Sequence, residues 1–130
     1  MRGSCFCNKV RFEIDVVKVE AYHCHCSICR KVTGSKFNTA FTVSANHFRW
    51  IGSNESIKTF RKNGNGFRHD FCGDCGCTVP NRYRDVMFWV PVGLLDDDDG
   101  VEVSKHIFVE SKAKWDEITD DLEQFEGYPE

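Results

Sequence analysis

The sequence predicts an all-β protein, and three observations support this fold class. Short apolar or alternating runs recur along the 130-residue chain and are separated by turn-forming residues. Aromatic side chains make up 13% of the residues, which suits a small β-rich core in which each ring buries a large area. Helical patterns are few and short. Because no repeat, low-complexity tract or Pro/Gly-rich linker divides the chain, we expect a single domain over residues 1–130.

The expected strands coincide with these runs, and turn residues stand between them. In chain order they are Lys9–Asp15, Glu20–His23, Phe37–Val43, Phe48–Trp50, Ile57–Phe60, Gly66–Cys72, Thr78–Asn81, Met87–Val92 and Lys105–Val109. The expected turns are Gly52–Asn54, Asn63–Gly66 and Asp96–Gly100.

Two short helical segments interrupt the strand pattern. One is expected over Ser27–Val32, where Ser27 can cap the N-terminus and Gly34 can end the helix. Asp116–Phe125 is expected to form another turn or two near the end of the chain.

Charge and hydropathy exclude two classes of partner. The net charge of −3 and the pI near 5.9 leave no basic footprint of the kind that nucleic-acid binding requires. No apolar run approaches the roughly 18–20 residues of a membrane span, and the N-terminal segment lacks the apolar core of a signal peptide. We therefore expect a cytoplasmic protein, in which the eight cysteines stay reduced and clustered pairs indicate metal rather than disulfides.

Two cysteine pairs have the spacing of a closed metal site. Residues i and i+2 of an extended segment project to one face, so Cys5 and Cys7 can present two thiols together. Cys72 and Cys75 form a C-x2-C pair in a glycine-containing turn and can do the same. Together the pairs predict a structural four-cysteine zinc site, which can contribute on the order of 10 kcal/mol to folding.

Cys24, Cys26 and Cys29 remain, and they are one ligand short of a tetrahedron. Three protein ligands and an open position are typical of a zinc ion that takes part in chemistry. The alternatives are that Cys77 or a histidine completes a second structural site, that an iron–sulfur cluster binds, or that no metal binds here. His23 and His25 flank Cys24, so we expect them to point away from the thiols.

Three thiolates and Zn²⁺ carry a formal charge of about −1, which makes the metal a weak Lewis acid and favours a fourth, soft ligand such as an incoming thiol. Nearby cations would offset that charge and hold the carboxylates of a small peptide thiol. The candidates are Arg30 and Lys31, with Arg68, Arg82 and Arg84 further along the chain. Thr33, Gly34 and Ser35 could present backbone N–H groups to an anion. Solvated surface charges and a plain helix-ending turn are the alternatives for these residues.

With these residues identified, almost the whole chain resembles the glutathione-dependent formaldehyde-activating enzyme family, which also includes centromere protein V. The resemblance is carried by G-S-C-F-C at 3–7, C-H-C-S-I-C-R-K-V-T-G-S at 24–35, F-C-G-D-C-G at 71–76, G-L-L-D-D at 93–97 and K-H-I-F-V-E-S-K-A-K-W-D-E-I-T-D at 105–120. It implies several coiled antiparallel β-sheets around a zinc knuckle. Two departures are Asn8, where the family usually has Gly, and Cys77, where it usually has Ser.

The resemblance also implies two zinc ions per chain and a reaction. The structural zinc maps to Cys5, Cys7, Cys72 and Cys75, and the catalytic zinc to Cys24, Cys26 and Cys29. The implied activity is that of a carbon–sulfur lyase that joins glutathione and formaldehyde into S-hydroxymethylglutathione, or of a lyase acting on a related thiol adduct. A non-catalytic, zinc-stabilised interaction module is the alternative, because the centromere relative suggests that the scaffold need not be an enzyme.

Overall fold

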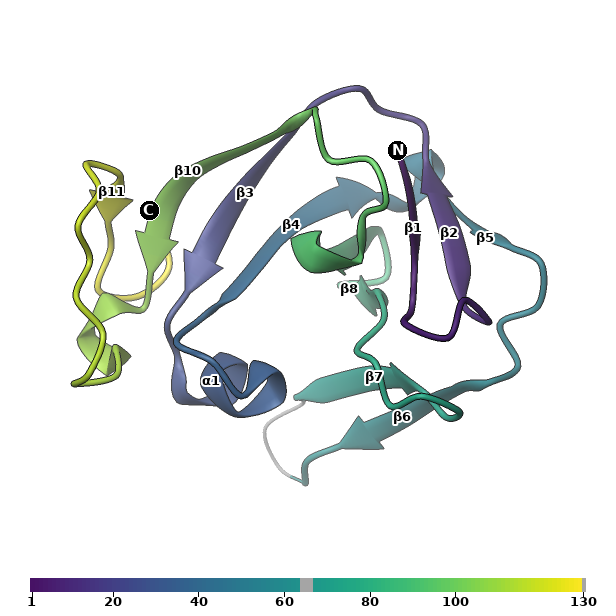
Figure 1. The fold of residues 1–130 in the computed structure, drawn as a ribbon, viewed down its shortest axis with the longest axis horizontal. Helices are drawn as coiled ribbons and strands as arrows, with labels where there is room; N and C mark the ends of the chain where they lie inside the picture. The colour runs from purple at the N-terminus through teal and green to yellow at the C-terminus, as the bar shows by residue number, and fades with distance from the viewer. Residues whose placement is uncertain (64–66, 130) are drawn as a thin grey trace.

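The computed structural model describes residues 1–63 and 67–129 and consists mainly of β-sheets with one short α-helix (Figure 1). The strands are β1 (Arg2–Ser4), β2 (Arg11–Ile14), β3 (Val19–Cys24), β4 (Asn38–Ser44), β5 (Phe48–Ile51), β6 (Ile57–Arg61), β7 (Arg68–Cys72), β8 (Asn81–Tyr83), β9 (Met87–Pro91), β10 (Val101–Ile107) and β11 (Glu123–Gln124). The helix is α1 (Ser27–Thr33), and 3-10 turns are η1 (Ala45–His47), η2 (Val92–Leu94) and η3 (Val109–Ser111). The all-β fold class is confirmed.

The largest sheet has the strand order β11-β10-β3-β4-β9-β8, and it carries most of the candidate site. The pairs from β3 to the β8 edge, β3–β4, β4–β9 and β8–β9, are antiparallel. β10 instead runs parallel to β3 and to β11, so the sheets are not antiparallel throughout. A parallel neighbour needs a long connection, and here almost the whole middle of the chain lies between β3 and β10.

The core lies between this sheet and the three-stranded sheet β1-β2-β5. β2 and β5 contribute Phe12, Ile14 and Phe48, which pack with alternate residues of β3, β4 and β9. The Phe48 and Phe88 rings stack with their centroids 3.8 Å apart. A smaller buried cluster surrounds Cys5 and Cys72 and joins the β1–β2 turn to the β6–β7 hairpin.

Several element boundaries differ from the sequence prediction. β1 was not predicted. β8 begins at Asn81 rather than Thr78, because Pro80 has no N–H for a ladder and the strand starts after it. β10 begins at Val101 and ends at Ile107, where Phe108 adopts a left-handed backbone with φ of 56°. The predicted turn Asn63–Gly66 and the start of the strand Gly66–Cys72 fall largely outside the described residues.

The helical turn predicted over Asp116–Phe125 is wrong. This segment is irregular and ends in β11, which pairs with β10. Its acidic side chains make tertiary contacts instead of leaving the backbone free to coil: Asp116 is buried beside His25, and Asp120 lies 3.0 Å from His106 Nε2. These contacts favour an extended path over local helix formation.

The helix α1 is present and ends at Gly34 as predicted, with φ of 63° at that glycine. Its N-cap is Cys26 rather than Ser27, because the Cys26 sulfur accepts the Cys29 N–H at 3.3 Å. None of the helices in the described ranges combines the length and apolar character that crossing a membrane requires. All eight cysteines lie in those ranges, and none is in a disulfide.

Candidate metal centres and cavity

The first metal-ligating group consists of Cys5, Cys7, Cys72 and Cys75, whose sulfur atoms all lie within 4.8 Å of one another. The Cys5 and Cys7 sulfurs are 3.6 Å apart, and the Cys7 and Cys72 sulfurs are 3.8 Å apart. Zinc–sulfur bonds of about 2.3 Å place the sulfurs of a tetrahedral site about 3.8 Å apart. The four side chains therefore have the spacing of a closed zinc site, and the predicted pairing of the two clips matches it.

Local backbone geometry brings each pair together. Asn8 has φ of 68° and donates its N–H to the Cys5 carbonyl, so asparagine, which tolerates a left-handed backbone, maintains this turn. Gly76 has φ of 76° and donates to the Cys72 carbonyl, which closes the second turn. The N–H groups of Cys77 and Cys7 point at the Cys75 sulfur and lower the pKa of this thiol to about 6. The turn thus favours the thiolate that a metal needs.

The second group is Cys24, Cys26 and Cys29, and their sulfur atoms also lie within 4.8 Å of one another. Cys24 ends β3 and is buried, whereas Cys26 and Cys29 lie at the start of α1 and are half-buried. The Cys24 and Cys29 thiols, together with the N–H groups of Cys29 and Ile28, lower the pKa of the Cys26 thiol. A strand end and a helix start therefore hold three thiols in a cluster that readily loses a proton.

No fourth protein ligand joins this group among the described residues. Cys77 packs beside the four-cysteine group and donates to the Thr78 carbonyl. His23 lies 2.7 Å from the Thr39 hydroxyl and stacks on Phe37. His25 is fully buried, with Nε2 2.8 Å from His106 Nδ1. The structure thus brings together the three predicted thiols and leaves out the residues considered as a fourth ligand.

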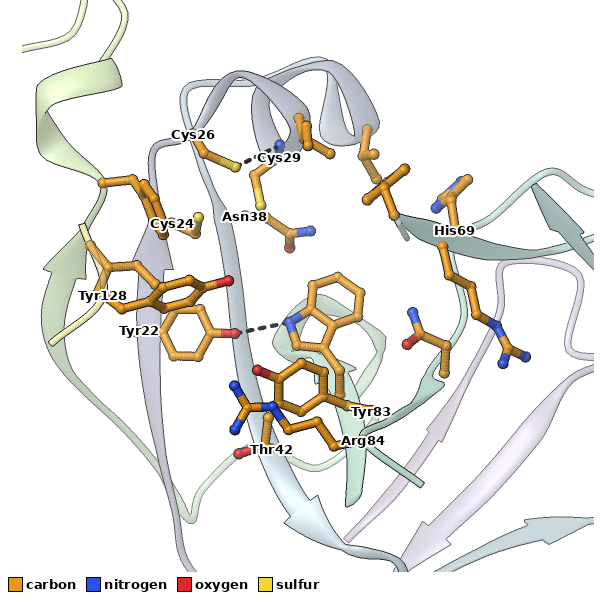
Figure 2. A pocket seen from close by; sticks show the side chains of 18 of the residues that line it. Tyr22, Cys24, Cys26, Cys29, Asn38, Thr42, His69, Tyr83, Arg84 and Tyr128 are labelled. Carbon is orange, nitrogen blue, oxygen red and sulfur yellow. Dashed lines mark hydrogen bonds between the residues drawn. The ribbon is translucent and has the colours of Figure 1, made fainter. Parts of the chain in front are cut away.

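The three-cysteine group faces a cavity of about 1110 Å³ (Figure 2). Alternate residues of the large sheet form one side of it, since successive side chains of a strand point to opposite faces. Tyr22 and Cys24 of β3, Asn38 and Thr42 of β4, and Trp89 of β9 all line it. The helix contributes Ile28, Cys29 and Val32, the β6–β7 hairpin contributes Arg61, Phe67, Arg68 and His69, and the C-terminal segment contributes Phe108 and Tyr128.

The positions of the predicted cations divide them into two sets. Arg68, Arg82 and Arg84 line the cavity, whereas Arg30, Lys31, Gly34 and Ser35 are not among its lining residues. The Arg30 side chain donates to the His25 carbonyl at 3.4 Å. The backbone N–H groups of Gly34 and Ser35 both donate to the Arg30 carbonyl and so take part in the helix end.

Arg68 and Arg84, which both line the cavity, differ in whether a carboxylate neutralises their charge. Arg68 forms two hydrogen bonds to the buried carboxylate of Asp70. The guanidinium of Arg84 lies 5.1 Å from the centre of the Tyr83 ring. No carboxylate pairs with Arg84 in residues 1–63 and 67–129, so its charge is available to an anion in the cavity.

Sequence reasoning missed the aromatic and amide lining of the cavity. Trp89 donates its indole N–H to the Tyr22 hydroxyl at 2.9 Å, and burial raises the pKa of Tyr22, which keeps it a neutral phenol. The i, i+2 relation of Tyr22 to Cys24 places both on one face and was available from the sequence. Asn38 and Trp89 reach the same face through strand pairing, which the sequence did not reveal.

Fold and site together define a β-sheet protein with two cysteine groups that can hold metal ions, one closed and one open toward a large cavity. The family model described as "Glutathione-dependent formaldehyde-activating enzyme" matches residues 1–111. The chain therefore belongs to the family of glutathione-dependent formaldehyde-activating enzymes.

A solved structure has a similar fold. It is the crystal structure of a Rhodobacter sphaeroides protein, with a TM-score of 0.61 and 25% sequence identity. The match covers 74% of this chain and 88% of that chain.

Proposed function

We propose that the chain is a zinc-dependent carbon–sulfur lyase that acts on adducts of a glutathione-type thiol. Its reaction is the joining of glutathione and formaldehyde to S-hydroxymethylglutathione, or a related reaction. The observation that carries this proposal is the three-thiol group Cys24, Cys26 and Cys29, which faces a large cavity and has no fourth protein ligand in the described residues. Family membership supports the substrate class.

The cysteine residues fix the place of reaction. Cys24, Cys26 and Cys29 would hold a zinc ion through their thiolates, and that ion would supply an open coordination position that lowers the pKa of an incoming thiol. Because a free thiol is only about 3% ionised at pH 7, this raises the fraction of reactive anion by about 30-fold. The substrate sulfur then forms a bond to the aldehyde carbon, and the carbonyl π pair moves to the oxygen. That oxygen takes a proton from water, while the thiol proton leaves to solvent.

Charged residues bind the substrate and balance the site. Arg84 lines the cavity without a carboxylate partner in the described residues, and we assign it to a carboxylate of the peptide thiol. Arg30 and Lys31 lie on the helix that carries Cys29, where their charges offset those of the thiolates. We also propose that residues 1–130 act as one domain in the cytoplasm, where reduced cysteines persist.

Cobalt substitution tests the open coordination position. The thiolate–metal absorption of the cobalt protein is expected to change on titration with glutathione and to stay constant with S-methylglutathione, which has no thiol to ionise. Elemental analysis is expected to find two zinc ions per chain and only one in Cys26→Ser, the matched control in which the glutathione response disappears. A spectrum that glutathione leaves unchanged contradicts the proposal and favours a non-catalytic interaction module with a saturated site.

A further inference from the structure

Asn38 occupies a position beside the three-cysteine group. It is the first residue of β4 and pairs directly with Cys24 at the end of β3. Directly opposite residues of an antiparallel pair have Cβ atoms about 4.5–5.5 Å apart and project to the same face. The Asn38 amide therefore lies next to the thiols on the cavity side of the sheet, as Figure 2 shows.

The Asn38 side chain faces the cavity and has no hydrogen-bond partner among the described residues. Only 5% of the residue is exposed, and the side chain makes no hydrogen bond within residues 1–63 and 67–129. Its amide atoms are not among the fully enclosed polar atoms that lack a partner, so they keep contact with the cavity, where water or a ligand can bond to them. In the described residues, the fully enclosed side-chain atoms without a hydrogen-bond partner are His25 Nδ1 and Asp116 Oδ2, which lie 3.5 Å apart and do not line the cavity. Asn38 differs from them because its unpaired amide faces the cavity beside the thiols.

A ligand in the cavity would satisfy this amide. An asparagine side chain offers two N–H donors and a carbonyl acceptor, so it suits a hydroxyl or carbonyl oxygen. Thiolates repel an oxygen that gains negative charge, so such an oxygen needs a hydrogen-bond donor beside it. Tyr22 is the other neutral polar group of β3 on this face, but it lies one pleat further from the cysteines and already accepts from Trp89.

We propose that Asn38 is a catalytic residue that donates an N–H to the aldehyde oxygen as the carbon–sulfur bond forms, and to the hydroxymethyl oxygen of the product. This role rests on the proposed function. As sulfur adds to the carbonyl carbon, the π pair moves to the oxygen that Asn38 contacts, and this oxygen is then protonated by water. In the reverse direction the hydroxyl proton returns to water, the carbonyl re-forms and the carbon–sulfur bond breaks. Loss of one such donor typically lowers kcat by about 100-fold or more.

Binding of two inert product analogues tests the contact without turnover. S-(2-hydroxyethyl)glutathione and S-propylglutathione differ by a hydroxyl in place of a methyl group. Their dissociation constants are measured by calorimetry on the zinc-loaded wild type and on Asn38→Ala. For each protein, the hydroxyl preference is the dissociation constant of the propyl compound divided by that of the hydroxyethyl compound. We expect this preference to be about threefold to tenfold larger in the wild type than in Asn38→Ala. Preferences that are equal within error in the two proteins overturn the proposal.

Two further variants guard against indirect effects. Asn38→Leu keeps a similar side-chain volume but has no polar group, and is expected to lose the preference as Asn38→Ala does. Asn81→Ala removes another asparagine that lines the same cavity, on β8, and is expected to keep it. If Asn81→Ala loses the preference to the same extent as Asn38→Ala, the effect is not specific to Asn38 and the proposal is wrong.

Exchange of formaldehyde with glutathione, followed by NMR, tests the proposed reaction and the catalytic role of Asn38 separately. With an active wild type, Asn38→Ala is expected to lower kcat by about 100-fold and to leave the KM for glutathione unchanged. An active wild type with an unaffected variant overturns the catalytic role of Asn38. A wild type that does not accelerate exchange but has the hydroxyl preference refutes the proposed reaction, while Asn38 remains a ligand contact.

Discussion

Replacement of Cys75 by serine is expected to destabilise the protein strongly, because it removes a long-range cross-link. Cys7 and Cys72, which the four-cysteine group joins, are 65 residues apart. Closing a loop of this length removes about 4 kcal/mol of chain entropy from the unfolded state, on the model used for disulfides. This is a large share of the 5–15 kcal/mol by which domains are stable. Cys75 is half-buried, so the substitution adds less desolvation cost than one at the fully buried Cys72.

Cys26→Ser provides the comparison. Its group lies within the segment from Cys24 to Cys29, so the loop it closes is short and its loss costs about 2 kcal/mol less. Both variants are compared with the wild type by urea denaturation of the zinc-loaded proteins, with tryptophan fluorescence as the signal. With an m-value of about 1.5 kcal/mol/M, the midpoint of Cys75→Ser is expected to fall by between about 2 and 3 M.

Cys77→Ser is the matched control, because Cys77 lies outside both cysteine groups. This variant is expected to keep its metal content and most of its stability. Equal midpoint shifts for Cys75→Ser and Cys26→Ser would refute the division into a structural and a functional site.

Four further predictions address the site and its supports. Cys26→Ser is expected to reduce formaldehyde–glutathione exchange to the uncatalysed rate with an unchanged far-UV CD spectrum; residual catalysis would contradict the assigned role. Arg84→Ala is expected to raise the KM for glutathione about tenfold with little change in kcat, because it removes one charge-assisted hydrogen bond; steady-state kinetics check this, and an unchanged KM would exclude Arg84 from binding. Gly76→Ala is expected to cost about 1–2 kcal/mol, because φ is 76° and nothing lies within 4 Å of the added Cβ; urea denaturation measures this, and a neutral result would mean that the turn relaxes. Burial lowers the pKa of His69 below its usual 6.5. Between the lowered pKa and about pH 6.5, the unfolded chain therefore binds a proton that the folded chain does not, and the free energy of unfolding decreases as the pH falls through this range. His69→Gln is expected to reduce this loss of stability at low pH without changing stability at pH 8. If the free energy of unfolding depends on pH equally in the wild type and in His69→Gln, the prediction is wrong.

Much of the fold class and both cysteine groups were predictable because their patterns are local. The spacing of Cys5 and Cys7, and of Cys72 and Cys75, lets each pair present two thiols together, whereas the meeting of the two pairs across 65 residues depends on the tertiary structure. The helix end at Gly34 follows in the same way from a residue that tolerates a left-handed backbone. The wrong helical prediction near the C-terminus has the opposite cause, since Asp116 and Asp120 make contacts with residues distant in sequence.

By itself, the sequence determined the thiol groups, the turns that present them and the mainly β character of the chain. Only the tertiary structure decided what surrounds the three cysteines. Asn38 reaches Cys24 through the register of β3 with β4, Trp89 reaches this face through β9, and Arg84 reaches it through the β8–β9 turn. A shift of one residue in any of these pairings would turn the side chains to the other face of the sheet. Since packing against a distant part of the chain selects the register, no short stretch of sequence contains that information.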